Sequence, residues 1–458
     1  MIRLLMLSCF AAVIAVMGCA VPHRDTAWPE RRPLGSEFEN YEAPPESRGT
    51  SSPTFVEPEG ELTLRDALSL ALMHNPKLES TSWSVRIGEA RALQARVLSN
   101  PEIEFEAEEI AGSVSHPDFD AAGMSIRLSQ HIEIGGKRSA RRRFAESEGR
   151  LAGWDYETER LAVLTDATLG FIDVLTGQER FQLTQEIVRL SEKTLAAVTE
   201  RVNAGKVSPL EKIKADVELA NNEVELNKVG SELRSARKRL ASTWGSTTPL
   251  FSRAVGVIDR VSEIPIYESV QAHLSQNPDV ARLAQEMERR LAALALARAR
   301  RVPDLTVGIG VQRFEETNDH ALTFGLGLPL PLFDRNQGGV LEARYRLAQL
   351  RHERESAEVQ TSTALAESYE ILIAARAEAL GLKNEVVPGS TKAFDAAQEG
   401  YQQGKFNYLE VLDAQRTMFE ARSRLLGALA QYHRSVAIVE SLIGTKLASL
   451  QNEKEREQ

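Results

Sequence analysis

Two carboxylates near the C-terminus have the spacing of a charged helix face. Glu410 and Asp413 lie three residues apart in the segment YLEVLDAQ, so a helix would place both side chains along one face. Rings of carboxylates in a symmetric assembly attract cations and can bind basic partners. The competing interpretation is structural, because Asn407 and Glu410 have the order of a capping box that closes the start of a helix.

A related segment lies 199 residues earlier in the chain. VNAGKVSPLE, residues 202–211, matches YQQGKFNYLE, residues 401–410. Gly205 and Gly404 occupy equivalent places and predict the end of a helix, since glycine readily adopts the left-handed conformation found there. Each segment therefore predicts a turn between two helices.

The residues after these glycines predict how the next helix begins. Ser208 to Glu211 has the pattern of a capping box with Pro209 at the first helical position, and Asn407 to Glu410 is its counterpart. The first segment has Glu211 and Lys214 where the second has two acids. The acidic pair therefore belongs to the second segment alone.

The sequence contains no motif typical of a metal site, a catalytic site or a nucleotide-binding site. The eight histidines lack H-x-x-x-H spacing, both cysteines lie within the first 19 residues, and nucleophile elbows and dinucleotide loops are absent. The segment GGKRS lacks the spacing of a phosphate-binding loop. A net charge of -10 disfavours nucleic acid as a partner. We expect no catalytic residues, no cofactor and no stable metal site.

The N-terminus reads as an export signal. Arg3 precedes a short apolar run that ends in Val-Met-Gly-Cys at Cys19, which resembles the lipobox of bacterial lipoproteins. That resemblance implies a signal peptide of residues 1–18 and a lipidated Cys19 at the mature N-terminus. Lipoproteins that are retained in the inner membrane commonly have an aspartate after the cysteine. This chain has Ala20 there and so resembles lipoproteins of the outer membrane. An ordinary signal peptide or a short membrane anchor is the alternative.

Residues 19–61 predict a tether, because seven of the 18 prolines lie between Pro22 and Pro58. Ordered structure is expected from about Leu62. No later run of about 18 apolar residues predicts a transmembrane helix, so a membrane-spanning part of the mature chain would have to consist of strands.

The remaining chain repeats one domain-sized unit. Asn75-Pro76 recurs as Asn277-Pro278, 202 residues later, and Asn100-Pro101 matches Val302-Pro303 at the same offset. Together with the glycine turns, these landmarks predict a first repeat at 62–260, a second at 261–445, and a polar tail at 446–458. Each Asn-Pro pair is expected to close a helix.

Each repeat carries unusually long helical stretches. The 66 residues from Lys137 to Val202 contain no proline, and one continuous helix of that length would measure about 100 Å. Such a helix must pack lengthwise against others to bury its apolar stripe. The second repeat predicts long helical stretches at 338–387 and 389–442, with a break at Pro388 and the Gly404 turn within the second stretch.

Four segments alternate apolar and polar residues, two in each repeat, at about 102–108, 124–134, 305–312 and 322–330. Alternation over about ten residues is typical of a barrel strand between lipid and water, although a half-buried sheet gives it too. Four strands cannot close a membrane barrel, and an open sheet edge is not tolerated in lipid. Several chains must therefore share one barrel if these strands span the membrane.

From residue 62 to about 445 the sequence resembles the TolC-type outer-membrane efflux family. That family implies a mainly α-helical protein with membrane β-strands, in which a homotrimer forms one twelve-stranded β-barrel continued by a periplasmic α-helical tunnel. The segments QHIEIGGKRSARR (130–142) and PLPLFDRNQGG (329–339) resemble the branch that works with heavy-metal cation exporters of the resistance-nodulation-division type.

The resemblance implies a passive channel in the cell outer membrane. Its partners would be outer-membrane lipid, a periplasmic adaptor at the helix tips, and a proton-driven inner-membrane transporter. Glu410 and Asp413 match the family's periplasmic gate. Drug efflux or type I protein secretion is the alternative within the family, and a periplasmic coiled-coil scaffold without a pore is the alternative of another class.

Overall fold

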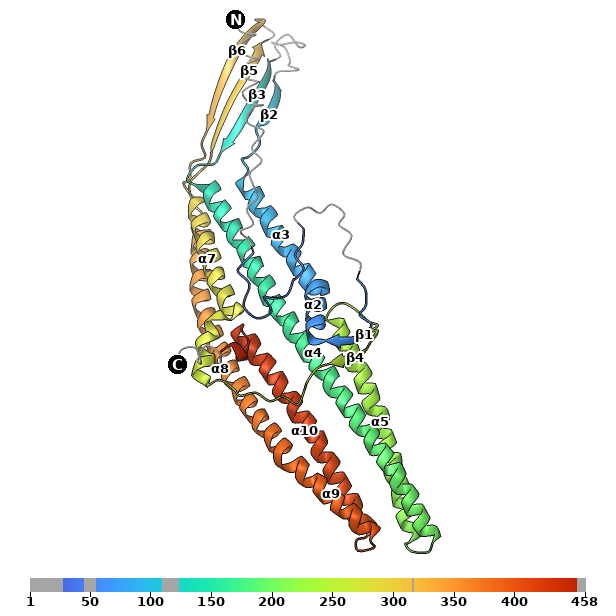
Figure 1. Cartoon of the computed structure of the whole chain (residues 1–458). Helices are drawn as coiled ribbons and strands as arrows, with labels where there is room; N and C mark the ends of the chain where they lie inside the picture. The colour runs from blue at the N-terminus through green and yellow to red at the C-terminus, as the bar shows by residue number, and fades with distance from the viewer. Residues whose placement is uncertain (1–27, 45–54, 109–122, 315–316, 451–458) are drawn as a thin grey trace.

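The computed structural model describes residues 28–44, 55–108, 123–314 and 317–450. The protein is a long rod with strands at one end and two helical hairpin tips at the other (Figure 1). The elements of the first half are β1 (Gly60–Thr63), α2 (Leu64–His74), α3 (Pro76–Arg96), β2 (Glu102–Glu108), β3 (Gly123–Ile132), α4 (Lys137–Asn203), α5 (Pro209–Ser242) and β4 (Phe251–Val255).

The second half repeats the same plan. Its elements are α6 (Tyr267–Ala272), a 3-10 turn (His273–Gln276), α7 (Pro278–Ala299), β5 (Leu305–Phe314), β6 (Asp319–Gly327), α8 (Gln337–Gly381), a π turn (Leu382–Val386), α9 (Val387–Gln402) and α10 (Tyr408–Ile443).

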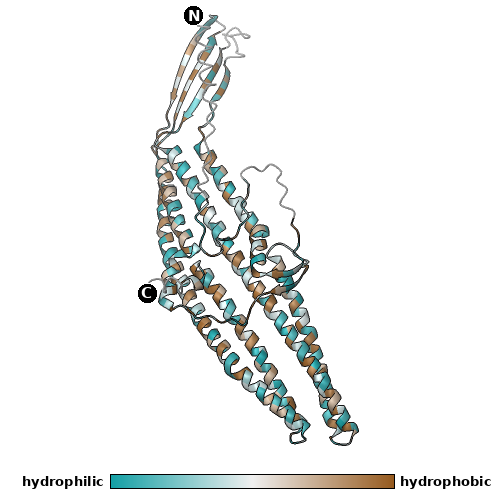
Figure 2. Ribbon diagram, viewed as in Figure 1, coloured by the Kyte–Doolittle hydropathy of each residue, from teal (hydrophilic) through white to brown (hydrophobic). Residues whose placement is uncertain are grey.

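The four predicted strands form one antiparallel sheet in the order β2-β3-β5-β6. Ile126 of β3 lies opposite Phe105 of β2 and Val311 of β5, and Val311 lies opposite Leu322 of β6. Because side chains alternate between faces, this register places the apolar residues of all four strands on one face. Figure 2 shows the resulting alternation along the strands.

Helix α4 confirms the prediction of one continuous helix from Lys137. It packs against α3 and α7 near the strands, and against α5 and α10 towards the tips. Its buried side chains, such as Tyr156, Leu164 and Phe171, recur at helical spacing. A helix of this length is stable because neighbouring helices cover its apolar stripe along most of the rod.

Pro388 does not break the helix as expected. The chain passes from α8 through a π turn at Leu382–Val386 directly into α9, where Pro388 lies within the first two positions. Proline removes one hydrogen-bond donor and crowds the preceding turn, and a wider π turn accommodates both effects without ending the helix.

The two Asn-Pro pairs close one helical element, as expected, and also start the next, since Asn75 is the C-cap of α2 and Asn277 ends the 3-10 turn. Asn75 and Asn277 are N-caps, and each side-chain oxygen accepts hydrogen bonds from the first turn of the helix that follows. Their amide groups also donate to equivalent carbonyls 199 residues apart, Thr243 at 2.8 Å and Leu442 at 2.9 Å. The duplication therefore extends to individual hydrogen bonds.

The expectation that ordered structure begins near Leu62 is wrong for residues 28–44. Arg160 and Glu157 of α4 form an ion pair in which each side chain is at most 2% exposed. Glu157 accepts from the backbone N–H of Arg32 at 2.7 Å, and Arg160 donates to the carbonyl of Leu34 at 3.1 Å. This N-terminal arm is held because the buried charges take backbone groups as partners.

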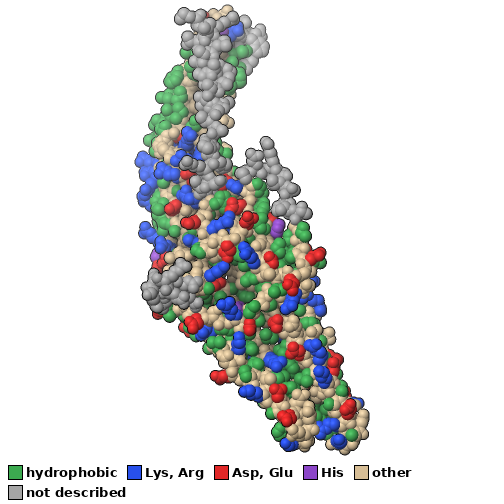
Figure 3. All heavy atoms as spheres, in the orientation of Figure 1, with side chains coloured by type: hydrophobic (Ala, Val, Ile, Leu, Met, Phe, Trp, Pro, Cys, Tyr) green, Lys and Arg blue, Asp and Glu red, His purple; other side chains and the backbone are tan. Residues whose placement is uncertain are grey.

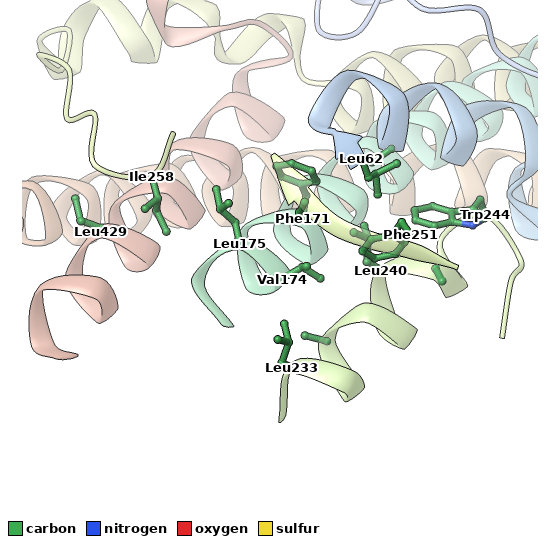
Figure 4. Close-up of a cluster of buried hydrophobic side chains, with 14 of the residues drawn as sticks. Leu62, Phe171, Val174, Leu175, Leu233, Leu240, Trp244, Phe251, Ile258 and Leu429 are labelled. Carbon is green, nitrogen blue, oxygen red and sulfur yellow. The ribbon is translucent and has the colours of Figure 1, made fainter. Parts of the chain in front are cut away.

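A small parallel sheet of β1 and β4 was not predicted, because each strand has only four or five residues. It covers α4 and α5 midway along the rod, where Leu62, Phe251 and Trp244 join Phe171 and Leu240 in a buried cluster (Figure 4). No helix in the described part of the chain combines the length and apolar character needed to cross a membrane.

Candidate functional site

The polar face of the four-stranded sheet is acidic at one edge. Glutamates stand at every second position of β2, so their carboxylates share that face; they are Glu102, Glu104, Glu106 and Glu108. Arg127 of β3, directly opposite Glu104, approaches it at 3.6 Å. The rest of the face carries mainly small polar residues and glycines of β5 and β6.

The opposite face of the sheet is apolar and exposed. Phe105 is 74% exposed, Leu322 is 75% exposed and Phe324 is 73% exposed. Exposed apolar surface of this extent marks contact with a membrane or a partner. The edge strands β2 and β6 each pair on one side only among the described residues, so the sheet has two edges at which further strands can add.

At the other end of the rod, both predicted glycine turns are present. Gly205 has φ +71° and Gly404 has φ +74°. In the first turn the Lys206 N–H donates to the Arg201 carbonyl, and in the second the Lys405 N–H donates to the Gly400 carbonyl. These bonds define a Schellman motif, in which a left-handed glycine ends the helix.

The second tip has the predicted capping box. The Glu410 N–H donates to the Asn407 side-chain oxygen at 3.1 Å, and the Asn407 N–H donates to the Glu410 carboxylate at 2.9 Å. Glu410 therefore caps the start of α10. Asp413 is exposed on the next turn and accepts no hydrogen bond from the described residues.

The capping box predicted for the first tip is wrong. Ser208 accepts only from the Leu210 N–H, at 3.3 Å, and the side chain of Glu211 does not return to the Ser208 backbone. One carboxylate oxygen of Glu211 is instead buried without a hydrogen-bond partner. The Ser208 hydroxyl contacts the N–H of the second helical residue, Leu210, and not that of the third, so the reciprocal pair of a capping box is absent.

The two tips contact each other through side chains that the sequence did not single out. The guanidinium of Arg201 lies 4.1 Å from the centre of the Tyr401 ring and donates to the Tyr401 carbonyl at 3.0 Å. Farther from the tip, Arg416 of α10 forms an ion pair with Glu218 of α5. These contacts join helices of the first repeat to helices of the second.

Burial and charge change the acid–base properties of this contact. Burial, with the nearby Glu218, raises the pKa of Tyr408 to about 12. Burial also raises the pKa of Tyr401, and the hydrogen bond to Glu218 raises the pKa of Arg416. All three groups therefore keep their protons at neutral pH.

The remaining predicted site residue, Cys19, lies outside the described residues. Within residues 28–44, 55–108, 123–314 and 317–450, no group of three or more histidine, cysteine, aspartate or glutamate side chains could hold a metal ion. The two chemically distinctive regions are thus the acidic sheet face and the paired tips.

A four-stranded sheet with two open edges, continued by paired long helices, is a distinctive architecture that known proteins share. The family model described as outer membrane efflux protein matches residues 67–246 and 269–445. The chain belongs to this family. The two matched segments follow the internal duplication, and the family members are channel proteins of the outer membrane.

The relatives include close and distant members of the family. The cobalt-zinc-cadmium resistance protein CzcC of Cupriavidus metallidurans is 37% identical over 407 residues, which cover 88% of this chain and 96% of CzcC. TolC of Escherichia coli is 22% identical over 71% of this chain and 70% of TolC. The crystal structure of CusC superposes with a TM-score of 0.72 at 17% identity, covering 93% of this chain and 99% of that one.

Proposed function

We propose that this protein is the outer-membrane channel of a tripartite efflux system of the resistance-nodulation-division type, and that it exports heavy-metal cations. The observation that carries the proposal is the row of four carboxylates on the polar face of a sheet whose other face is apolar. With lipid on the apolar side, the carboxylates line the water-filled side and favour cations. The similarity to CzcC along nearly its whole length supports metal cations as the substrate.

The open sheet edges support a homotrimer. Three copies of the four-stranded sheet would supply twelve strands to one barrel and leave no unpaired edge in lipid. The alternative of a coiled-coil scaffold without a pore does not account for this sheet. Drug efflux or type I protein secretion stays the alternative within the same fold.

Planar bilayers test the channel part of the proposal. In a salt gradient, the reversal potential gives the ratio of cation to anion permeability. Replacing the four β2 glutamates by glutamine should move that ratio towards unity. The matched control replaces four exposed glutamates of the middle of the rod, Glu30, Glu59, Glu61 and Glu268, and should leave it unchanged. A wild-type channel without cation preference would contradict the proposal.

The substrate is tested in cells that lack their own channel of a cation efflux system. Expression of this protein should restore tolerance to cobalt, zinc or cadmium. Restored tolerance to drugs, with no effect on metals, would instead favour the alternative within the family.

At the tips, we infer that Asp413 forms the ring of carboxylates that narrows the periplasmic mouth, with Glu410 beside it. Asp413 supports this role because it is exposed and not used in the helix cap. A periplasmic adaptor would bind around Gly205, Ser208, Glu211, Gly404 and Asn407, and would connect the channel to a proton-driven inner-membrane transporter. Unchanged conductance and divalent-cation block after replacing Glu410 and Asp413 would exclude the gate.

We also propose that Cys19 carries the acyl chains of a lipoprotein. Metabolic labelling with palmitate tests this directly: wild-type protein should incorporate the label, and Cys19→Ala should not. Labelling that persists in C19A would place the modification elsewhere.

A further inference from the structure

Basic side chains gather where the strands join the helices, although the whole chain has a net charge of -10. Figure 3 shows this accumulation below the strands, over the upper parts of the helices. The residues are Arg138, Arg141, Arg142 and Arg143 of α4, Arg298 at the end of α7, the following Arg300 and Arg301, and Arg335 before α8.

Polar contacts hold the ends of α4, α7 and α8 next to the strands at one level along the rod. The Asn336 amide donates to the Ala297 carbonyl at 2.8 Å, which joins the start of α8 to the last turn of α7. Lys137, the first residue of α4, pairs with Asp304 at 2.7 Å, just before β5. The arginines of different helices therefore lie at similar depth.

Arg143 lies on the apolar side of this junction. Lys137 is on the polar side, because its partner Asp304 also contacts His131, which shares the polar face of β3 with Arg127. Arg143 follows six residues later, about 120° around the helix by the shorter way, and so lies off that side. Its guanidinium reaches back towards the strands and donates to the Ser139 hydroxyl at 3.3 Å.

Arg298 shares this side with Arg143. It belongs to an exposed stripe of α7 with Glu288, Leu291 and Ala295, spaced three and four residues apart. Glu288 pairs with Arg150 of α4 at 3.3 Å, and Arg150 is seven residues from Arg143, two turns along the same face. The stripe of α7 and the Arg143 face of α4 are therefore adjacent.

Arg335 follows the lower end of the apolar sheet face. Beyond the end of β6 at Gly327, Leu328, Leu330 and Leu332 are exposed, and Phe333 is 90% exposed. Arg335 comes two residues later, with its Nε held by the Pro331 carbonyl at 3.0 Å. A cation thus stands directly beyond the last exposed apolar side chains.

Within the described residues, Arg143, Arg298 and Arg335 have no carboxylate partner, unlike Arg142, which shares Glu146 with Arg96. All three are exposed. We call them the outer arginine collar. Three positive groups without counter-charge, below an apolar surface, match a ligand with phosphate at one end and acyl chains at the other.

We propose that the outer arginine collar binds the phosphate groups of anionic phospholipids in the leaflet that faces the periplasm. The inference rests on the proposed membrane-spanning role of the strands, because only then does the collar lie at headgroup depth. A soluble acidic protein would not need the adjoining apolar face. A lipid satisfies both surfaces at once, and each arginine near an anionic surface contributes about fivefold in lipid affinity.

The test uses the full-length assembly in nanodiscs that contain equal amounts of phosphatidylcholine and phosphatidylglycerol. After transfer to mild detergent, mass spectrometry measures the phosphatidylglycerol that stays bound. The wild type should be enriched in it, and R143Q/R298Q/R335Q should lose at least about fivefold of that enrichment. A triple lysine variant, which keeps the charge, should retain part of it.

The matched control removes three exposed charges far from the four-stranded sheet, with R189Q/R234Q/K238Q, and should retain the full enrichment. Equal loss in this control would overturn the proposal, because overall charge would then explain the binding. Unchanged enrichment in the collar variant would overturn it as well. If the triple variant fails to assemble, R298Q alone must still lower the enrichment. Normal cation selectivity of the collar variant separates this test from the proposed channel function.

Discussion

The two helix tips have the same backbone but different chemistry. Both turn through a left-handed glycine with the same pair of backbone hydrogen bonds. The position of Arg201 in the first tip is Gly400 in the second, where the Phe406 ring occupies the space that a side chain would need. Lys214 in the first tip corresponds to Asp413 in the second.

This difference shows that the two repeats can keep the same turn and yet have tips with different roles. The turn geometry is required in both copies, because each must reverse a long helix. The side chains around it are free to diverge, and the first repeat supplies Arg201 and Glu218, which bind Tyr401 and Arg416 of the second repeat. We infer that the first tip holds the second in place, while the second carries the acidic groups that meet the solute.

The largest expected effect comes from breaking the contact between the tips. R201A/R416A removes a cation–π contact with its hydrogen bond and an ion pair, together worth about 1–2 kcal/mol. If these contacts keep the tips together, the open population, and with it the time-averaged conductance, should rise about tenfold. Planar-bilayer recording measures this change.

The control for this variant is R354A. It removes an ion pair of 2.7 Å to Glu358 within α8 and leaves the tips untouched, so conductance should stay at the wild-type value. An unchanged conductance in R201A/R416A would show that the two tips are held by other contacts.

A second experiment moves the acidic group from one tip to the other. D413N should weaken divalent-cation block about fivefold, because it removes one charge per chain at the mouth. K214D adds a carboxylate at the matching position of the first tip and should strengthen the block. A divalent-cation block that changes as much with K214D as with D413N would show that the two tips do not have separate roles.

The helix caps provide a smaller difference. N407A should destabilise the start of α10 by about 1 kcal/mol, since it breaks a complete capping box. S208A should destabilise the start of α5 by only a few tenths of the N407A effect, because Ser208 makes a single long hydrogen bond. Hydrogen exchange of the first-turn amides of the two helices measures both, and equal losses would contradict the comparison.

The smallest expected effect is that of E410Q. Glutamine also closes a capping box, so protection of the α10 amides should change by less than about 0.5 kcal/mol. Any change in divalent-cation block would then report the charge of Glu410 alone. A block as weak as that of D413N would give Glu410 an equal part in the gate.

Much of the fold is readable from local patterns. Alternation identified the four strands, and the proline-free stretch identified α4, because each pattern reflects one periodic environment. Pro388 misled the prediction, and the Asn-Pro pairs, which close helical elements as expected, also start the next helix. A proline marks a place where regular hydrogen bonding is interrupted, but neighbouring residues decide whether the helix ends, starts or widens into a π turn.

The sequence by itself determined the duplication, the strands, the two glycine turns and the acidic pair, because each of these depends on residues close together in the chain. Only the tertiary structure decided which residues meet across the repeats. Arg201 and Tyr401 are 200 residues apart, and no local pattern distinguishes them from other surface side chains. The same holds for the N-terminal arm, whose proline-rich sequence resembles a tether until buried Glu157 and Arg160 provide partners for its backbone. Long-range packing determines these contacts, because an ion pair or a ring contact becomes strong only where another segment of the chain buries it.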